Sequence, residues 1–372
     1  MRPLEGLLVL SLEQAVAAPY CSSRLADAGA RVIKIERPEG DFARYYDRAV
    51  GGLSSYFVWL NRGKQSLVVD IKAAEDAALL HQILKRADVF IQNLAPGAAE
   101  RAGFGAAMLR QRHPRLITMD ISGYGDTPSY AEMKAYDLLV QAESGLASIT
   151  GHPAGPGRVG VSIVDVGCGM SAHAGILEAL IERGITGQGK QLSTSLFAAT
   201  ADWMTVPLLY AEGTGKAPER LGLSHPTVCP YGAYALRDGA LVLISVQNER
   251  EWAQFCADFL EQPALPQAPG FESNVARVAN RSAVDALIAD RFATMDRGEA
   301  RRRLLGANTA FGFVNDIAAL AQHPALHRVE VGTPNGPAWL AAPPVRSTPG
   351  DRWLGPVPSI GEHSAAIRAE FA

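Results

Sequence analysis

The sequence of 372 residues has few cysteines, no excess of basic residues and no long apolar run. Its four cysteines are far apart and form no CxxC pair, which argues against a disulfide framework and a cysteine zinc site. The formal charge of −3 provides no basic field for nucleic acid or an acidic membrane surface. No stretch of about eighteen apolar residues and no secretory leader pattern is present. We therefore expect a globular protein of the reducing cytoplasm that binds neither nucleic acid nor membrane.

Several common site motifs are also incomplete or missing. Residues 184–191, GITGQGKQ, resemble a phosphate-binding loop, but Gln191 replaces the hydroxyl residue that would hold magnesium, and we interpret the glycines as a helix end. Residues 103–105 lack the third glycine of a dinucleotide fingerprint. His323 and His327 have zinc-helix spacing without the accompanying Glu, and we interpret them as a helix start. No GxSxG motif occurs. These gaps predict a protein with no metal and no tightly bound cofactor.

The first 125 residues alternate short apolar runs with helical patterns. Residues 7–12 and Arg31–Glu36 have the composition of strands and flank a helical segment that Gly29 ends. A second unit has an apolar helical stripe over residues 79–87 and a buried strand over residues 89–91. Strands joined by helices in this way predict an α/β fold with a parallel sheet that is covered on both faces.

A change in composition follows Tyr210. Residues 211–226 are rich in glycine, proline and charge, which is typical of a linker. Beyond it, residues 231–246 alternate around an Asp238-Gly239 turn and predict a β-hairpin, and helical patterns over residues 250–260 and 283–303 follow. We therefore expect a second, smaller α+β domain.

Asp165 is the most suggestive carboxylate in the sequence. In GVSIVDVGCGM, residues 160–170, an apolar run leads to what we interpret as a glycine-lined turn just before a helix. Such a turn lets backbone approach a ligand, and a helix N-terminus favours negative charge. An ordinary helix-capping Asp would give the same pattern. Cys168 has no His close in sequence to mark it as a nucleophile, so the residues alone leave the nucleophile open.

Several segments, in order along the chain, together resemble one family. They are VLSLEQAVAAPYCSSRLADAGARVIKIERPEGDFAR (9–44), WLNRGKQSLVVDIK (59–72), DVFIQNLAPGAAERAGFG (88–105), ISGYG (121–125), and the block from AYDLL (135–139) to GVSIVDVGCGMSAHAGILEAL (160–180). These segments are similar to the class III CoA-transferase family, which includes formyl-CoA and carnitine CoA-transferases and the 2-methylacyl-CoA racemases. The resemblance is strongest over residues 4–196 and extends more loosely to the end of the chain.

The resemblance implies a Rossmann-like large domain with a parallel sheet, a smaller α+β domain, and an interlocked homodimer. Carried onto this sequence, residues 1–215 are the first part of the large domain and residues 216–325 are the small domain. Residues 326–372 return to the large domain.

The resemblance also implies the reaction and its residues. Asp165 falls on the family's catalytic aspartate, which is acylated in turn as an anhydride and as a CoA thioester. Coenzyme A is then a substrate, and an acyl-CoA and a carboxylic acid are the small-molecule partners. The residues that fall in the CoA-binding segments are Val16, Arg37, Asn61, Lys64, Asn93, Leu94, Arg101 and Lys134.

One pair of residues bears on the type of reaction. The family's racemases have a His before an Asp where this chain has Tyr136-Asp137, and an unperturbed Tyr is a poor base at neutral pH. We therefore expect CoA transfer, with Tyr136 and Asp137 in the catalytic site. A racemase, or a CoA-ester-binding protein without activity, is the alternative. Many transferases of the family use succinyl-CoA and a short dicarboxylate, and Arg44, Arg48 and His225 are our candidates for binding the free carboxylate.

Overall fold

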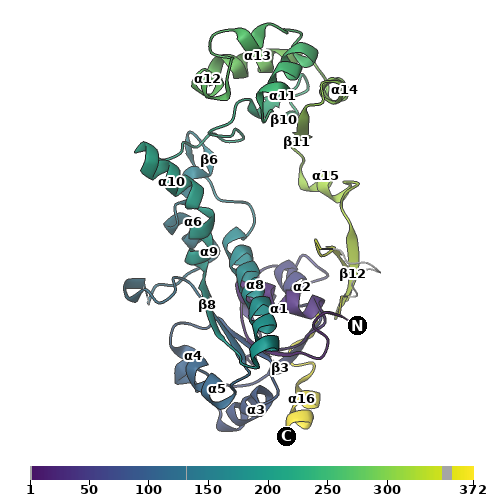
Figure 1. The fold of residues 1–372 in the computed structure, drawn as a ribbon. Helices are drawn as coiled ribbons and strands as arrows, with labels where there is room; N and C mark the ends of the chain where they lie inside the picture. The colour runs from purple at the N-terminus through teal and green to yellow at the C-terminus, as the bar shows by residue number, and fades with distance from the viewer. Residues whose placement is uncertain (1, 131, 346–353) are drawn as a thin grey trace. The chain divides into compact units, whose positions relative to one another are not determined.

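The main feature of the structure is a sheet of six parallel strands (Figure 1). The structure is a computed structural model, and it describes residues 2–130, 132–345 and 354–372. In sheet order the strands are β3 (Lys64–Val68), β2 (Arg31–Glu36), β1 (Leu8–Leu12), β4 (Val89–Gln92), β5 (Ile117–Ser122) and β8 (Gln191–Ser195). The chain first builds outward from β1 and then returns to its other side at β4. The sheet therefore has a topological switch point between β1 and β4, where α/β proteins bind nucleotides.

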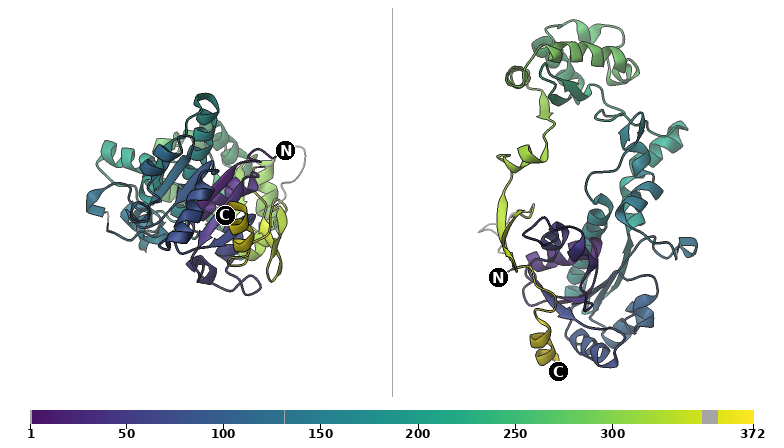
Figure 2. Two further views of the ribbon diagram at one scale, coloured as in Figure 1. Left: turned by 90° about the horizontal axis from the view of Figure 1, so that it is seen from below. Right: turned by 180° about the vertical axis from the view of Figure 1, so that it is seen from behind.

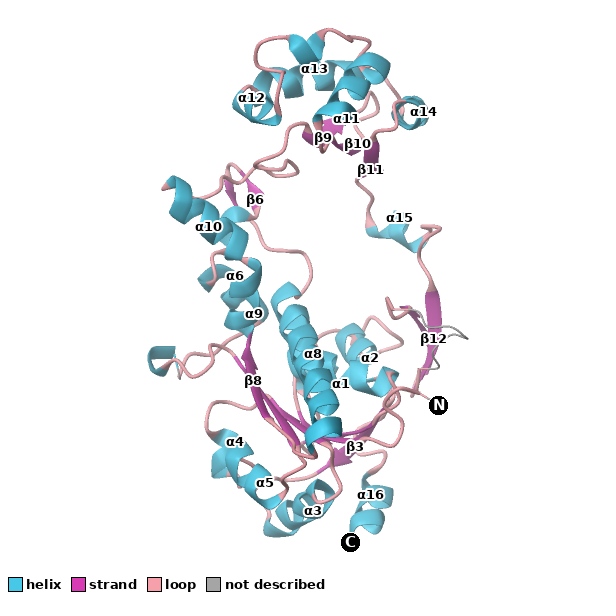
Figure 3. Cartoon of the chain, in the orientation of Figure 1, coloured by secondary structure: helices cyan, strands magenta, loops and turns pink. Residues whose placement is uncertain are grey.

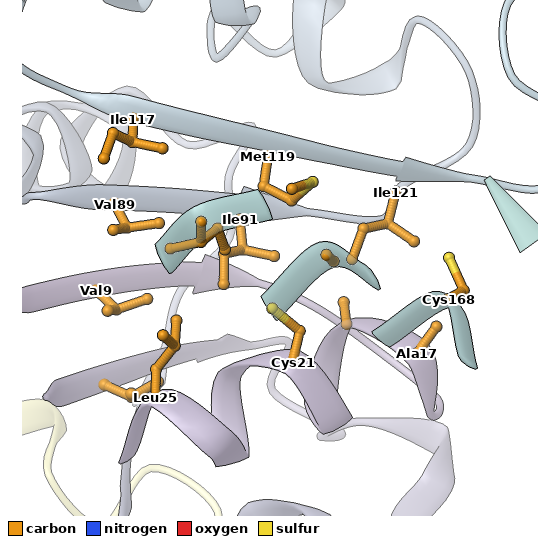
Figure 4. Packing of buried hydrophobic residues seen from close by; sticks show 14 of the residues in the cluster. Val9, Ala17, Cys21, Leu25, Val89, Ile91, Ile117, Met119, Ile121 and Cys168 are labelled. Atoms are coloured by element: carbon orange, nitrogen blue, oxygen red, sulfur yellow. The ribbon is translucent and has the colours of Figure 1, made fainter. Parts of the chain in front are cut away.

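The central strands β1 and β4 bury apolar side chains on both faces of the sheet, because successive residues of a strand point in opposite directions. In β1, Val9 belongs to one buried cluster, whereas Leu8 and Leu10 belong to another. Figure 4 shows the first cluster, in which Val89 and Ile91 of β4 lie with side chains from the helices above. The predicted doubly covered parallel sheet is thus confirmed.

Helices cover both faces of the sheet (Figure 3). On the first face lie α1 (Ala17–Asp27), α6 (Asp137–Glu143), α8 (Ile163–Thr186) and α9 (Leu196–Trp203), with α2 (Ser55–Asn61) packed on α1. On the second face lie α3 (Ala74–Leu84), α4 (Ala98–Arg101), α5 (Ala106–Arg112) and α16 (Ser364–Phe371). Short elements complete this part of the chain: the 3-10 helices η1 (Phe42–Tyr45) and η2 (Pro128–Tyr130) and the helix α7 (Leu146–Ile149).

Helix α8 is long and apolar enough, by length and composition, to cross a membrane. In the structure it packs along α1, α9 and strands β5 and β8. Ala172, Ile176 and Ala179 form its buried stripe. It is therefore the core helix of the first face. It ends where the sequence predicts, because Gly187 adopts a positive φ of 74° at the C-cap, which ends a helix at little steric cost.

The end of the described chain returns to the sheet. Strands β12 (Arg328–Thr333) and β13 (Gly336–Ala341) form a hairpin that packs on α2 through Phe57 and Val58. Helix α16 follows and buries Ile367 and Phe371 in the second cluster. Residues from both ends of the described chain thus share one core. Figure 2 shows α16, in yellow, beside elements of the first part of the chain.

The chain divides into two compact units. Unit 1 contains the chain up to Ala147, Arg158–Leu208 and His327–Ala372, and unit 2 contains Ser148–Gly157 and Leu209–Leu326. Two of these limits lie near the predicted boundaries at residues 215 and 325, whereas the membership of Ser148–Gly157 in unit 2 was not predicted.

Unit 2 contains a three-stranded antiparallel sheet with helices packed on it. Its strands and helices are β6 (Gly151–His152), β7 (Gly155–Pro156), β9 (Tyr231–Ala235), β10 (Leu241–Ser245), β11 (Ala310–Phe313), α11 (Glu249–Gln254), the π-helix η3 (Phe255–Phe259), the 3-10 helix η4 (Leu265–Gln267), α12 (Asn274–Ala279), α13 (Arg281–Ala293), α14 (Arg297–Gly306) and α15 (Ile317–Ala321). Helix α10 (Thr205–Thr214) crosses the limit between the units. The predicted hairpin is confirmed as β9 and β10.

The predicted helical pattern over residues 283–303 is confirmed as parts of α13 and α14, which are separated because Asp296 caps α14 by accepting the backbone N–H of Glu299. One local prediction at the end of unit 2 is wrong. His323 and His327 do not start a helix; they lie between α15 and β12, where the His323 ring accepts the N–H of Ala325.

Candidate active site

Asp165 lies in the first turn of α8. The helix continues without interruption through Gly167 and Gly169, so the predicted glycine-lined turn is wrong. A side chain at Gly167 would overlap the ring of Trp203, and one at Gly169 would overlap the carbonyl oxygen of Ala17. These glycines therefore serve close helix packing, which offsets their cost of about 1 kcal/mol each in a helix.

The carboxyl of Asp165 sits in an environment that disfavours its charge. Burial, together with the neighbouring carboxylate of Asp137, raises the pKa of Asp165 to about 7. Burial removes solvation from the ionised form, and a like charge adds repulsion. The carboxyl is thus poised between its two ionisation states at neutral pH. Such a displaced pKa is typical of a functional carboxylate.

Asp137 contacts the helix that carries Asp165. It is the first residue of α6, and its Oδ1 accepts the backbone N–H of Val164 at 2.8 Å and that of Asp165 at 3.2 Å. The two predicted aspartates therefore do lie together. Tyr136 precedes Asp137 at the N-cap of α6 and is 55% exposed.

A tyrosine that the sequence reasoning missed lies close to this pair. Burial raises the pKa of Tyr46 to about 12, and the neighbouring groups that add to this rise include Asp165 and Tyr136. The Tyr46 ring meets the ring of Tyr56 edge-on, with 5.6 Å between the centroids. The Tyr56 hydroxyl in turn lies 2.9 Å from the Oγ atom of Ser162. No motif or periodicity marks these tyrosines in the sequence, and their position became visible only in the fold.

Cys168 lies one turn along α8 from Asp165 but does not suit a nucleophile. Its side chain is fully buried (0% exposed), and burial raises the pKa of its thiol to about 12. The thiolate is the reactive form of cysteine, and it would be scarce at neutral pH. The structure therefore favours the carboxyl of Asp165 over the thiol of Cys168 as the reactive group of this helix.

A cavity of about 1060 Å³ opens in unit 1 at the carboxyl ends of β1, β2, β3 and β4. This is the switch-point edge at which α/β sheets bind nucleotides. The cavity is lined by Leu12, Glu13, Gln14, Ile35, Glu36, Arg37, Pro38, Glu39, Gly40, Asp41, Phe42, Tyr45, Val69, Asp70, Ile71, Lys72, Leu94, Ala95, Ala98, Arg101 and Ala102.

The cavity brings together three of the residues that the resemblance assigned to CoA: Arg37, Leu94 and Arg101. It also includes Lys72, which we did not predict. Lys64 and Lys72 belong to the same segment of the resemblance, residues 59–72, so the motif alone pointed to either lysine as the phosphate contact. Three exposed cations around one cavity suit the phosphates of a nucleotide.

Lys64, which the resemblance assigned to CoA, is not among the residues that line the cavity. It is only 2% exposed, and its Nζ atom donates to Glu13 at 2.6 Å and to Asn61 at 3.1 Å. Asn61 is itself fully buried, and Val16 is buried against Tyr20. All three predicted contact residues are therefore buried, and none of them is among the residues that line the cavity.

Lys64 belongs to a buried set of charges, which we call the ion network. Its members are Glu13, Lys34, Glu36, Asp41, Arg44 and Lys64. Lys34 lies 2.8 Å from Asp41 and 3.5 Å from Glu13. Burial would raise the pKa of Glu13, but the two lysines outweigh it and lower that pKa to about 2. The network contains three acids and three bases and fixes residues that line the cavity.

Of the three candidates for a substrate carboxylate, Arg44 is already engaged by other groups of the protein. Its guanidinium binds Glu36 at 2.7 Å and stacks on Phe57, 3.7 Å from the ring centroid. Arg48 is exposed in unit 1. His225 belongs to unit 2, where it stacks on Tyr231.

The two remaining predicted residues lie outside the cavity lining. The Oδ1 atom of Asn93 accepts the backbone N–H of Gln14 and its Nδ2 atom donates to the backbone carbonyl of Gln14, both at 2.9 Å. Asn93 thereby holds a residue that lines the cavity. Lys134 is exposed between η2 and α6.

The fold defines an α/β protein with a doubly covered parallel sheet and a cavity at its switch point, and comparison with known proteins gives its family. The model of CoA-transferase family III matches residues 4–364. An acetyl-CoA:oxalate CoA-transferase of Acetobacter aceti is 35% identical over 100% of this chain and 96% of the relative. A succinate–glutarate CoA-transferase of Agrobacterium fabrum is 32% identical over 99% of this chain and 96% of the relative.

Solved structures agree with these sequence relatives. A CaiB/BaiF family protein from Brucella suis shares 32% identity with a TM-score of 0.85, and each chain is covered completely. A hypothetical protein from Mycobacterium tuberculosis shares 25% identity with a TM-score of 0.86, over 98% of this chain and 99% of the other. The chain belongs to CoA-transferase family III, and it is an enzyme of the CoA-transferase type. The resemblance deduced from its motifs is confirmed.

Proposed function

We propose that this enzyme moves CoA from an acyl-CoA, in the first instance succinyl-CoA, to a short dicarboxylic acid through Asp165. The observation that carries the proposal is the carboxyl of Asp165, held in the first turn of α8 with a pKa raised to about 7. Its ionised form is destabilised by burial and by Asp137, and acylation removes that charge.

The proposed reaction has four balanced steps. The carboxylate of Asp165 attacks the donor thioester, which forms an acyl anhydride and releases CoA thiolate. The thiolate attacks the carbonyl of Asp165, which forms an enzyme thioester and releases the donor acid. The acceptor carboxylate then attacks this thioester, which forms a second anhydride and again releases CoA thiolate. The thiolate finally attacks the acceptor carbonyl, which gives the new acyl-CoA and restores Asp165.

An anhydride suits this exchange better than the esters of other nucleophiles. A carboxylate is a weak nucleophile, and it opens a serine ester poorly, whereas an anhydride is activated enough for each step to be reversible. CoA would lie along the switch-point cavity, with Arg37, Lys72 and Arg101 at its phosphates. Water must be excluded while the anhydride exists, or it hydrolyses.

Named relatives support a dicarboxylic acceptor. Besides the oxalate and glutarate enzymes, a succinyl-CoA:mesaconate CoA-transferase of Haloarcula hispanica is 33% identical over 100% of this chain. In this chain we propose an acceptor of four to six carbons such as mesaconate or glutarate, with oxalate as the shorter competitor. Arg48 and His225 remain the candidates for its free carboxylate.

The proposal is tested by trapping the enzyme intermediates. Incubation with succinyl-CoA and then hydroxylamine should modify the peptide that contains Asp165. Asp165→Ala should still bind CoA but lose transfer activity, and Cys168→Ser is the matched control on the same helix. Turnover by Asp165→Ala within tenfold of the wild type would contradict the assignment. Products of a panel of acids, measured by mass, identify the acceptor.

A racemase is the competing function, and isotope exchange separates the two. With a 2-methylacyl-CoA in deuterated water and no acceptor acid, a transferase incorporates no deuterium at the α-carbon. With succinyl-CoA and a short dicarboxylic acid it should release free succinate and new CoA ester in equal amounts. Rapid α-exchange without acid-dependent transfer would instead make Tyr136 or Asp137 a base.

We further propose that the enzyme is an interlocked homodimer and lies in the cytoplasm.

A further inference from the structure

The N-terminus of α8 lacks the cap that a helix usually has. Its first backbone N–H groups have no partner within the helix, and a Ser, Thr, Asp or Asn side chain at the N-cap commonly accepts one of them. Ser162 occupies the N-cap position but makes no side-chain cap. Its hydroxyl instead lies 2.9 Å from the Tyr56 hydroxyl.

Asp137 supplies the missing acceptor from another helix. One carboxylate oxygen, Oδ1, receives the N–H groups of both Val164 and Asp165, at 2.8 Å and 3.2 Å. The other oxygen, Oδ2, receives the Nε2–H of Gln141 at 2.7 Å. Both oxygens are therefore engaged.

Gln141 extends this arrangement along the chain that leads into α8. It is fully buried in α6, one turn after Asp137, and its Oε1 accepts the backbone N–H of Val159 at 2.9 Å. Two side chains of one helix thus hold the residues on both sides of the α8 N-terminus.

We propose that Asp137 is a positioning residue, whose carboxylate caps α8 from α6 and fixes the first turn that carries Asp165. This inference rests on the proposed function of Asp165 and changes the predicted role of Asp137 from a catalytic residue to a positioning one. Three N–H groups bind its two oxygens, so the carboxylate is held in place between α6 and the start of α8.

The cap also has an electrostatic consequence. The titratable groups that interact with Asp165 include Asp137, Tyr46 and Cys168. The pKa of Tyr46 and that of Cys168 are both raised to about 12, so these two groups are neutral at pH 7. The carboxylate that positions Asp165 is therefore also the charge that opposes its ionisation, and this opposition ends when Asp165 is acylated.

Two variants of the full-length enzyme separate the cap from the charge. Asp137→Asn keeps an Oδ1 acceptor for the helix cap but removes the charge and the acceptor of Gln141, whereas Asp137→Ala removes all three. Glu143→Gln is the control, because Glu143 is an exposed acid of the same helix. Hydrogen–deuterium exchange of the peptide over residues 160–170 reports the cap, and the pH profile of kcat/KM reports the charge.

We expect exchange at Val164 and Asp165 to be about 2- to 30-fold faster in Asp137→Ala, which is the usual range for a lost cap. Asp137→Asn should keep slow exchange, and its acid limb of kcat/KM should move to lower pH. In Asp137→Ala, kcat should fall more than the KM for acyl-CoA rises.

The proposal would be overturned if the amides of Val164 and Asp165 exchanged in Asp137→Ala at the wild-type rate. It would also be overturned if the acid limb of the kcat/KM profile of Asp137→Asn stayed at the wild-type pH. If Asp137→Ala does not fold, Asp137→Asn still tests it through the acid limb. The exchange readout needs no turnover. It therefore stays informative even if trapping shows that Asp165 is not the acylated residue, and the two failures can be told apart.

Discussion

Two carboxylates of unit 1, the buried Glu13 and the half-buried Asp165, have opposite electrostatic environments. Burial by itself would raise the pKa of each, but Lys64 and Lys34 lower the pKa of Glu13 to about 2. Asp165 has Asp137 as its charged neighbour, and its pKa rises to about 7. The comparison teaches that burial alone does not make a carboxyl reactive. The same protein stabilises one carboxylate as a fixed structural ion and leaves the other ready to lose its charge.

The largest expected effect comes from breaking the ion network. Lys64→Met leaves Glu13 with one cation fewer in a buried site, and we expect the free energy of unfolding to fall by about 3 to 5 kcal/mol. Denaturant unfolding at pH 7 measures this loss. The matched control is Lys72→Met, because Lys72 is exposed, and its unfolding should change by less than about 0.5 kcal/mol. Equal stability of the two variants would contradict the structural role of Lys64.

The pH dependence of the wild type sharpens the same point. The folded pKa of Glu13, about 2, lies below its ordinary value of 4.5. The folded state therefore binds this proton less tightly than the unfolded state, so the stabilisation is complete above pH 4.5 and is lost as the pH falls through about 2. Between pH 4.5 and about 2, the free energy of unfolding should fall less steeply with pH in Glu13→Gln than in the wild type. An equal dependence on pH in both proteins would show that other acids account for the acid unfolding.

A smaller effect distinguishes the cations of the cavity from those of the network. Replacing Arg37, Lys72 or Arg101 by Gln removes a charge-assisted contact to a phosphate, and each should raise the KM for CoA esters about tenfold. Their stability should stay near that of the wild type. Steady-state kinetics with succinyl-CoA gives the measurement. If KM is unchanged in all three, the nucleotide binds elsewhere.

The last expected effect is a gain in stability at Asp165. Its folded pKa, about 7, lies above the ordinary 3.8, so the folded state binds the proton more tightly and loses stability as the pH rises from about 4 to 7. Asp165→Asn removes this loss, and we expect it to be more stable at pH 8 by about 1 to 3 kcal/mol. At pH 4 the variant and the wild type should unfold alike. If Asp165→Asn is less stable than the wild type at pH 8, the surroundings of Asp165 do not disfavour its ionised form.

Much of the fold could be predicted because its signals are local. Buried parallel strands such as β1 and β4 are short apolar runs, and glycines mark the helix ends at Gly29 and Gly187. The glycines of α8 misled us, because nothing in the sequence shows that Trp203 presses against Gly167.

Site residues were harder to predict than elements. A motif identifies a segment, but it does not say which lysine of that segment faces the cavity: Lys72 lines it, whereas Lys64 is buried against Glu13. Tyr46 was missed because its approach to Asp165 depends on packing between distant segments. The function of Asp137 as a cap across 28 residues of sequence is likewise invisible without coordinates.

Helix α16 has a consequence for synthesis on the ribosome. Its residues Ile367 and Phe371 complete an apolar cluster that otherwise consists of residues from the first 116 positions, and Arg31 binds Glu370 at 2.6 Å. While the chain is being translated, that part of the cluster stays open until residue 371 has left the exit tunnel. We therefore expect the nascent chain to need protection by chaperones over most of its translation, and a bulky fusion placed directly after α16 to lower the yield of folded enzyme.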